Sequence, residues 1–432
     1  MTSALAVGVV LVVTAAAVVT PRRAVLALPA VILLSPYLSF GALSLRVEHV
    51  LVPVLWVIVV AKGRFRFVCP VSSRLWLLFV LFLFCVTTFR VTSGNETHGF
   101  ASGVYSYVLV FMLFTLFSTV SRTVPLLKGI VRSAVYCSVP LSLFALLQTL
   151  NVGWATNLTV DGYTSTSRVS VAKLMELTGY VVRGVSVFES PVYAAQYFLL
   201  ALAASVFLLI EGRTASGWRE RLVYAACAVF SLLGGVVTLS STFVLGGACV
   251  AGALFLLARK AAGFKVMFAV LVLAGVLAFS LPLLVEENPA IQGNLLYQVG
   301  RITSLSVLET RYDPDLGQTA GTLRAVVESP FWGWGWVEHR GAFVGDSLYL
   351  TQLYLGGFIG FLVFGAVFLD GVPVVMRGKE RGVKIFALWT AVMFLGGIGS
   401  PTLFAPRVGA LWWAAFGAGA GQAARMRRDV RD

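Results

Sequence analysis

The side chains best suited to chemistry gather in one polar segment, 286–345, and at the start of the apolar run that follows it. Guanidinium groups hold phosphate oxygens through paired hydrogen bonds and can stabilise the charge that develops on a departing diphosphate. Carboxylates and histidine can take a proton from a hydroxyl group, and aromatic rings can stack on sugars. The candidates for these roles are Arg301, Arg311, Arg324, Glu328, Trp332, Trp334, Trp336, Glu338, His339, Arg340, Asp346 and Tyr349.

A short helix is expected within this segment, over 319–328. Thr319 is suited to cap its start and Pro330 follows its end. Arg324 and Glu328 fall four residues apart, on one face of that helix. The pair is either a surface ion pair or part of a site.

The tryptophan-rich stretch after this helix also has two interpretations. Glycines at 333 and 335 separate the three tryptophans, and glycine lets the backbone turn tightly. Such a stretch could belong to an aromatic belt at the membrane surface. The glycine spacing favours a loop that stacks on sugars or closes over a site.

Asp346 is the first candidate for a general base, because it stands at the mouth of an apolar run near several arginines. Glu328, Glu338 and His339 are the further candidates. A carboxylate at the start of a helix can also serve only as a cap, and this alternative stays open for Asp346.

A second polar segment, 151–189, leads through Val-Arg-Gly-Val-Ser-Val-Phe-Glu-Ser-Pro into another apolar run. Its Arg183 either extends its charge from the membrane edge into water or binds an anionic headgroup. Pro191 suits the first turn of the next helix, whose free N–H groups would favour an anion nearby.

The rest of the chain predicts an all-α, polytopic transmembrane bundle in one domain, 1–432. Of its 432 residues, 58% are hydrophobic and 12% charged, with mean hydropathy +0.89, so lipid must be its solvent. Apolar stretches of about 20 residues, enough to cross a bilayer, recur along the chain. Twelve or thirteen spans are expected, at 4–20, 24–43, 47–61, 75–92, 101–120, 125–150, 190–211, 222–239, 243–258, 264–285, 346–369, 384–399 and 404–423.

Basic residues predict the orientation. Seven short segments hold 23 of the 33 Lys and Arg residues, and strict alternation of the spans puts all seven on one side, which is expected to be the cytoplasm. The two long loops, 151–189 and 286–345, then lie outside, and the N-terminus lies outside with them. The formal net charge of +14 is explained by topology, so nucleic acid is not expected as a partner.

No cofactor and no metal are expected. The sequence has no phosphate-binding loop of the G-x-x-x-x-G-K-[ST] type. Its three histidines lie far apart, without a partner at metal-ligand spacing. Four of the five cysteines fall within spans, so no disulfide is expected in the external loops.

Three motifs in order resemble the O-antigen polymerase and ligase superfamily of bacterial membrane glycosyltransferases. They are R-G-x-x-x-x-x-S-P at 183–191, T-L-R-x-x-x-x-S-P-x-x-G-x-G at 322–335, and L-Y-L-x-x-L-x-x-G-G-x-x-G at 348–360. The resemblance covers roughly 180 to 365. It implies a GT-C-like bundle in the cytoplasmic membrane that works on its outer face, without a metal. It also implies undecaprenyl-diphosphate-linked oligosaccharide as donor and acceptor, and leaves open whether a chain-length regulator joins it.

The resemblance also implies roles for single residues. The family's loop arginine falls on Arg324, and a second basic position falls on Arg301 or Arg183. Many relatives have a Ser-Arg pair where this chain reads Ser-Ser-Thr at 240–242. The ligases have a histidine where this chain has Asp346 and serine, which favours the polymerase branch.

The hypothesis from sequence is therefore a polymerase of lipid-linked oligosaccharide repeat units. Arg324 and Arg301, with Arg183, would hold the diphosphate, and Asp346 would take the proton of the attacking hydroxyl. Two alternatives stay open: a ligase that transfers the glycan to another lipid or protein, and a transporter or flippase of an anionic lipid-linked sugar. The residues expected to contact substrate are Arg183, Arg311, Glu328, Glu338, His339, Arg340, Trp334, Trp336 and Tyr349.

Overall fold

The computed structural model is almost entirely helical. It describes residues 2–40, 43–62, 67–68, 70–97, 100–163, 183–211, 217–257, 312–313, 319–339, 342, 347–376 and 381–429. Two short antiparallel strands, β1 (Leu38–Phe40) and β2 (Leu43–Leu45), join α2 to α3. The helices are α1 (Thr2–Val19), α2 (Pro21–Leu34), α3 (Val47–Ala61), α4 (Pro70–Thr92), α5 (Phe100–Ser121), α6 (Leu126–Thr149), α7 (Gly153–Gly162), α9 (Pro191–Glu211), α10 (Trp218–Val237), α11 (Ser241–Leu257), α15 (Ala320–Glu328), α16 (Leu348–Met376), α17 (Arg381–Gly396), the 3₁₀ helix η2 (Thr402–Phe404) and α18 (Val408–Asp429).

The chain is a multi-pass helical membrane protein. Six described helices, α4, α5, α6, α9, α10 and α16, are long and apolar enough to cross a bilayer, and shorter apolar helices stand in α1, α3 and α11. The expected span 264–285 lies outside the described residues. The span expected over 24–43 is wrong in its second half, because α2 ends at Leu34. Ser35 precedes Pro36, and a residue before proline is pushed out of the helical conformation.

α18 is a central helix, and it packs against α5, α6 and α16. A Cβ atom added at Gly417 or Gly421 would lie 2.4 or 2.2 Å from the carbonyl oxygen of Phe114 or Ser118 on α5. Side chains at these two positions would therefore hold the helices apart. The glycines in the sequence Gly-Ala-Gly-Ala-Gly allow the two backbones to approach, as small residues do between membrane helices.

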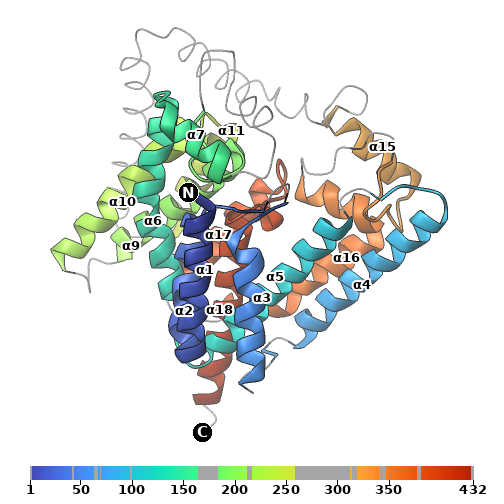
Figure 1. Cartoon of the computed structure of the whole chain (residues 1–432), viewed down its shortest axis with the longest axis horizontal. Coiled ribbons are helices and arrows are strands. Elements are labelled where there is room, and N and C mark those ends of the chain that lie inside the picture. The colour runs from blue at the N-terminus through green and yellow to red at the C-terminus, as the bar shows by residue number, and fades with distance from the viewer. Residues whose placement is uncertain are drawn as a thin grey trace.

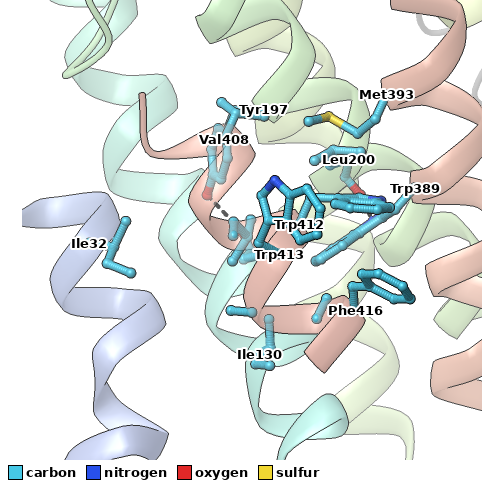
Figure 2. Packing of buried hydrophobic residues seen from close by; sticks show 14 of the residues in the cluster. Ile32, Ile130, Tyr197, Leu200, Trp389, Met393, Val408, Trp412, Trp413 and Phe416 are labelled. Atoms are coloured by element: carbon cyan, nitrogen blue, oxygen red, sulfur yellow. Dashed lines mark hydrogen bonds between the residues drawn. The ribbon is translucent and has the colours of Figure 1, made fainter. Parts of the chain in front are cut away.

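An aromatic core joins α18 to α17 and α9 (Figure 2). Trp389, Trp412 and Phe416 are fully buried, and Trp389 donates its indole N–H to the carbonyl oxygen of Leu200 at 2.8 Å. The Tyr197 hydroxyl donates to the carbonyl oxygen of Ala134 on α6 at 2.7 Å. The polar edges of these rings are thus satisfied without water, as burial in this bundle requires.

The helix ends meet at two opposite faces of the bundle (Figure 1). We name as the loop face the end where α2, α6, α10 and α17 finish and α3, α9, α16 and α18 start. Contacts there include Leu348 N–H to the carbonyl oxygen of Gly397 at 2.7 Å. At the opposite end, Lys62, which follows α3, donates to the carbonyl oxygen of Val18 on α1. Helix ends that the expected topology places on the same side of the membrane are therefore in contact with one another.

Candidate functional site

The loop after α15 inserts its backbone into a break in α16. Gly357 has φ 58° and ψ −163°, so the helix is interrupted about 14 Å from its first residue, Leu348. An interrupted helix leaves carbonyl and N–H groups without partners inside it, and burial makes such groups costly. The loop supplies the partners in four hydrogen bonds. Before the break, the N–H groups of Trp334 and Gly335 donate to the carbonyl oxygens of Tyr354 (2.7 Å) and Leu355 (2.9 Å). After the break, the N–H groups of Phe358 and Ile359 donate to the carbonyl oxygens of Pro330 (2.6 Å) and Phe331 (3.2 Å).

The two loop glycines make this insertion possible. Gly333 and Gly335 have φ values of 72° and 68°, the left-handed conformation that glycine adopts without strain. A Cβ atom at Gly333 would lie 2.5 Å from the backbone nitrogen of Gly357, and one at Gly335 would lie 2.8 Å from the Cα atom of Thr87. The tight turns expected from the glycine spacing are thereby confirmed.

Gly357→Ala should destabilise the protein by at least about 2 kcal/mol, because a non-glycine residue is strained at this φ and its Cβ would lie 2.3 Å from the carbonyl carbon of Phe331. Gly365→Ala is the matched control on the same helix, since nothing lies within 4 Å of its added Cβ atom. Denaturation in detergent measures both. Equal midpoints for the two variants would contradict the close contact.

Four side chains form a stack beside this loop. His339 lies on Trp334 with ring centroids 3.4 Å apart, and the guanidinium of Arg90 covers the same indole at 4.1 Å. Arg90 also donates to the carbonyl oxygen of Gly333 at 2.8 Å. His339 pairs with Glu328 at 2.6 Å. The stack ties α4, α15 and the loop together, and it leaves Trp334, 8% exposed, without a free face for a sugar.

The other expected residues of this segment take structural positions. Trp336 is 7% exposed, and its backbone N–H donates to the Thr87 hydroxyl at 3.0 Å. The Tyr349 hydroxyl donates to the carbonyl oxygen of Phe394 at 2.6 Å. Glu338 is exposed and Trp332 is 59% exposed. Thr319 is the N-cap residue of α15, as expected, but its side chain makes no capping hydrogen bond. Arg301, Arg311, Arg340 and Asp346 lie outside the described residues.

Arg183 is held at the turn between α10 and α11. Its Nε donates to the carbonyl oxygen of Thr238 at 3.0 Å and its Nη2 to that of Leu239 at 3.1 Å. Burial lowers the pKa of Arg183 to about 10, so the group stays charged at neutral pH. Two of its five N–H groups are used by these bonds, and in the described part of the chain the others are left for an anion.

An apolar cavity of about 330 Å³ opens next to this turn, between α9, α11 and α17. Along α11 its lining runs from Ser241 at the loop face to Ala253, which is about 18 Å of helix. Leu245 and Leu395 in its wall are each 49% exposed. The described residues therefore do not cover the cavity at these two side chains, and its described lining stops short of the basic segments at the opposite face.

Polar groups are placed at the loop-face end of this cavity. Ser241 and Thr242 begin α11 there, directly after the residues that hold Arg183. Tyr312, from the second long loop, also lines the cavity, and its hydroxyl donates to the carbonyl oxygen of Ile398. The second long loop thus lines the cavity through Tyr312, and the first long loop is bonded through Arg183 to the turn that precedes the lining residue Ser241.

Gln196 on α9 is the most unusual lining residue. Its side chain is fully buried, and neither amide atom has a hydrogen-bond partner in the described part of the chain. Buried amides are nearly always satisfied. Because the side chain has no accessible surface, the Gln196 amide is an unsatisfied group of the core beside the cavity.

Arg324 lies elsewhere on the loop face. It is exposed on α15, whereas Arg183 is bonded to the end of α10, and Figure 1 shows these helices on different sides of the face. The structure therefore does not bring these two arginines together. It does bring together Glu328, His339 and Trp334, which were expected separately as substrate contacts.

Sequence reasoning missed a buried charge cluster at the start of α18. Arg407 is 1% exposed and donates to three carbonyl oxygens at the end of α2. Its guanidinium lies 5.8 Å from the ring of Tyr37 and 5.3 Å from that of Tyr163. It interacts electrostatically with Glu189 and Glu48. A single arginine inside an expected span was the only signal available in the sequence.

Within the described ranges, no three of the His, Cys, Asp and Glu side chains are grouped so that they could hold a metal ion. Neither the known protein families nor the curated protein sequences contain a match to this chain.

Proposed function

We propose that the protein is a polymerase of lipid-linked oligosaccharides that works on the outer face of the cytoplasmic membrane. It transfers a growing glycan from undecaprenyl diphosphate to a sugar hydroxyl of a second lipid-linked unit, and it is a multi-pass, metal-independent glycosyltransferase of GT-C-like architecture. The observation that carries the proposal is an apolar cavity lined by Tyr312 of the second long loop, with Arg183 of the first loop bonded to the turn just before the lining residue Ser241.

The cavity suits the tail of the donor. Its wall is built from side chains such as Leu199, Val250 and Val392, which can pack against an isoprenoid tail through van der Waals contacts in place of lipid chains. An opening toward lipid lets a membrane-anchored substrate enter without leaving the bilayer. The polar end at Ser241 then receives the diphosphate near the level of the headgroups.

The charge at this end suits the leaving group. In the transfer, the acceptor oxygen bonds to the anomeric carbon, the bond from that carbon to the diphosphate oxygen breaks, and the diphosphate leaves with the electron pair. Arg183 is positioned by its two carbonyl partners to stabilise that charge. The N-terminus of α11, at Ser241, adds N–H groups that favour an anion.

Purified protein in nanodiscs, supplied with an undecaprenyl-diphosphate oligosaccharide, tests the proposal. A ladder of longer lipid-linked products with release of free undecaprenyl diphosphate is expected. One glycan added to an unrelated lipid would indicate a ligase instead. No glycan transfer to any acceptor would contradict the proposed chemistry.

Filling the cavity should weaken the donor interaction. Ala253→Phe places a ring in the space proposed for the tail, and overpacking an apolar site costs about 1–3 kcal/mol, so KM for the donor should rise about tenfold. Gly252→Phe is the matched control, because nothing lies within 4 Å of its added Cβ atom. An unchanged KM for Ala253→Phe, with normal folding, would place the tail elsewhere.

Transport is the competing function, and the break in α16 is the observation that favours it, because carriers often bind substrates at broken helices. The backbone of the loop after α15 occupies the free groups of this break, so they are not left for a substrate. Liposomes loaded with a labelled lipid-linked sugar separate the two functions. Movement of label across the bilayer without elongation would support a carrier.

A further inference from the structure

The loop after α15 descends along α4 from the loop face. Near the start of the loop, the Ser329 hydroxyl accepts a hydrogen bond from Arg90, close to the end of α4. The Trp332 ring then contacts that of Phe82, with ring centroids 6.2 Å apart. Phe82 lies about 15 Å of helix before the last residue of α4, Thr92. The loop therefore reaches the middle of a helix that is long and apolar enough to cross a bilayer.

The same loop returns to the loop face within a few residues. The backbone N–H of Trp336 donates to the Thr87 hydroxyl at 3.0 Å, about 8 Å of helix before the end of α4. The N–H of Glu338 then donates at 3.2 Å to the carbonyl oxygen of Glu96, which follows α4. The loop thus goes down along α4 and comes back up, and its lowest part contains Phe331 and Trp332.

This lowest part exposes apolar side chains. Phe331 and Trp332 are 60% and 59% exposed. Their exposed neighbours are apolar too: Phe358 is bonded to the loop, Leu362 lies one turn further along α16, and Leu81 is next to Phe82 on α4. An exposed apolar face on a helix that crosses a bilayer meets lipid, and the surface of the loop continues that face.

The charges of the loop are placed at its two upper ends. Glu328 precedes the descent and Glu338 follows the return, whereas the sequence between them, Ser-Pro-Phe-Trp-Gly-Trp-Gly-Trp-Val, has no charged residue. Charged side chains are costly at membrane depth, so this order suits a loop whose ends are in water and whose middle is in lipid.

The backbone of the loop also suits such a position. Non-helical backbone is tolerated at membrane depth only where its polar groups have partners in the protein. Four hydrogen bonds to the broken part of α16 supply such partners. Arg90 donates to the carbonyl oxygen of Gly333 at 2.8 Å, and the indole N–H of Trp334 donates to that of Ala325 at 2.7 Å.

We propose that residues 330–335 form a re-entrant loop, which enters the membrane leaflet at the loop face and contacts lipid hydrocarbon chains through Phe331 and Trp332. The inference is independent of the proposed glycan transfer, because it concerns only where the loop lies relative to the bilayer. The partner of this surface is lipid, and neither a second copy of the chain nor a sugar is expected on it.

Quenching of tryptophan emission tests this position. The purified protein is placed in phosphatidylcholine nanodiscs, with or without lipids brominated in the middle of the acyl chain, and iodide serves as the quencher from water. Trp332→Phe keeps an aromatic ring against Phe82, so the emission that it removes from the ten tryptophans is that of Trp332. This emission should be lost in brominated lipid and should not change with iodide.

A second variant moves the reporter to the upper end of the loop. Glu96 is exposed, and Trp332→Phe combined with Glu96→Trp should add an emission that iodide quenches and brominated lipid does not. Circular dichroism checks that both variants are folded. If the two reporters respond alike, the loop does not descend below the end of α4 and the inference is wrong.

The other responses of Trp332 contradict the inference as well. Quenching by iodide alone would place the ring in water, and equal quenching by both agents would place it among the headgroups. Resistance to both would mean that protein covers the ring, as a second copy of the chain could do.

Discussion

Arg183→Ala should lower the rate of glycan transfer by about 10²–10³, which is the usual effect of removing one donor to transition-state charge. The reason is the position of Arg183, bonded to Thr238 and Leu239 just before Ser241, where the cavity lining begins on α11. Donor binding should weaken much less than turnover, because the tail stays in the cavity. Steady-state rates with the lipid-linked oligosaccharide measure both quantities.

Two further variants show whether the effect is specific. Arg183→Lys keeps the charge but not the planar fork, so it should restore only part of the rate. Arg324→Ala should lose less than about tenfold, because Arg324 is exposed on α15, away from the cavity. If Arg324→Ala is inactive while Arg183→Ala retains full activity, the diphosphate site lies at α15 and the account of Arg183 is wrong.

Arg407→Ala should cost about 3–5 kcal/mol of stability, as expected when one partner of a buried charge network is removed. Three carbonyl oxygens at the end of α2, those of Ile32, Leu33 and Ser35, lose their donor. Each buried acceptor without a partner costs about 1–3 kcal/mol. The unfolding transition in detergent, followed by circular dichroism against added denaturing surfactant, measures the loss.

Arg23→Ala is the control for this variant. Arg23 is an exposed arginine at the opposite face, so its removal should change stability by no more than about 0.5 kcal/mol. A loss of less than about 1 kcal/mol for Arg407→Ala would mean that water reaches the end of α2 and replaces the guanidinium.

The elements that depend on nearby residues could be predicted from the sequence. The short helix expected over 319–328 is α15, Ala320–Glu328, because Pro330 and the helix-forming residues before it act locally. Glycines 333 and 335 adopt the turns expected of them. The break in α16 was not predicted, since Gly357 reads as an ordinary small residue within an apolar run.

Contacts between distant residues could not be read from the sequence. The span expected from residue 404 begins at Val408, which leaves Arg407 in a turn with φ 64°. Its partners Ile32 and Leu33 are more than 370 residues away. In the sequence, Gln196 is only a single amide side chain within an apolar helix. The packing of α9, α11 and α17 places it beside a cavity. Patterns of spacing report on one helix at a time, so they do not show which helix ends meet.

Photocrosslinking of a diphosphate-lipid analogue to the purified protein, with the labelled peptides identified by mass spectrometry, tests the central claim most directly. The account predicts that a reactive group near the diphosphate labels the segments around Arg183 and Ser241, and that a group on the tail labels residues facing the cavity, such as Val250. Labelling confined to α15 and the loop at Phe331 and Trp332, with the cavity unlabelled, would contradict it.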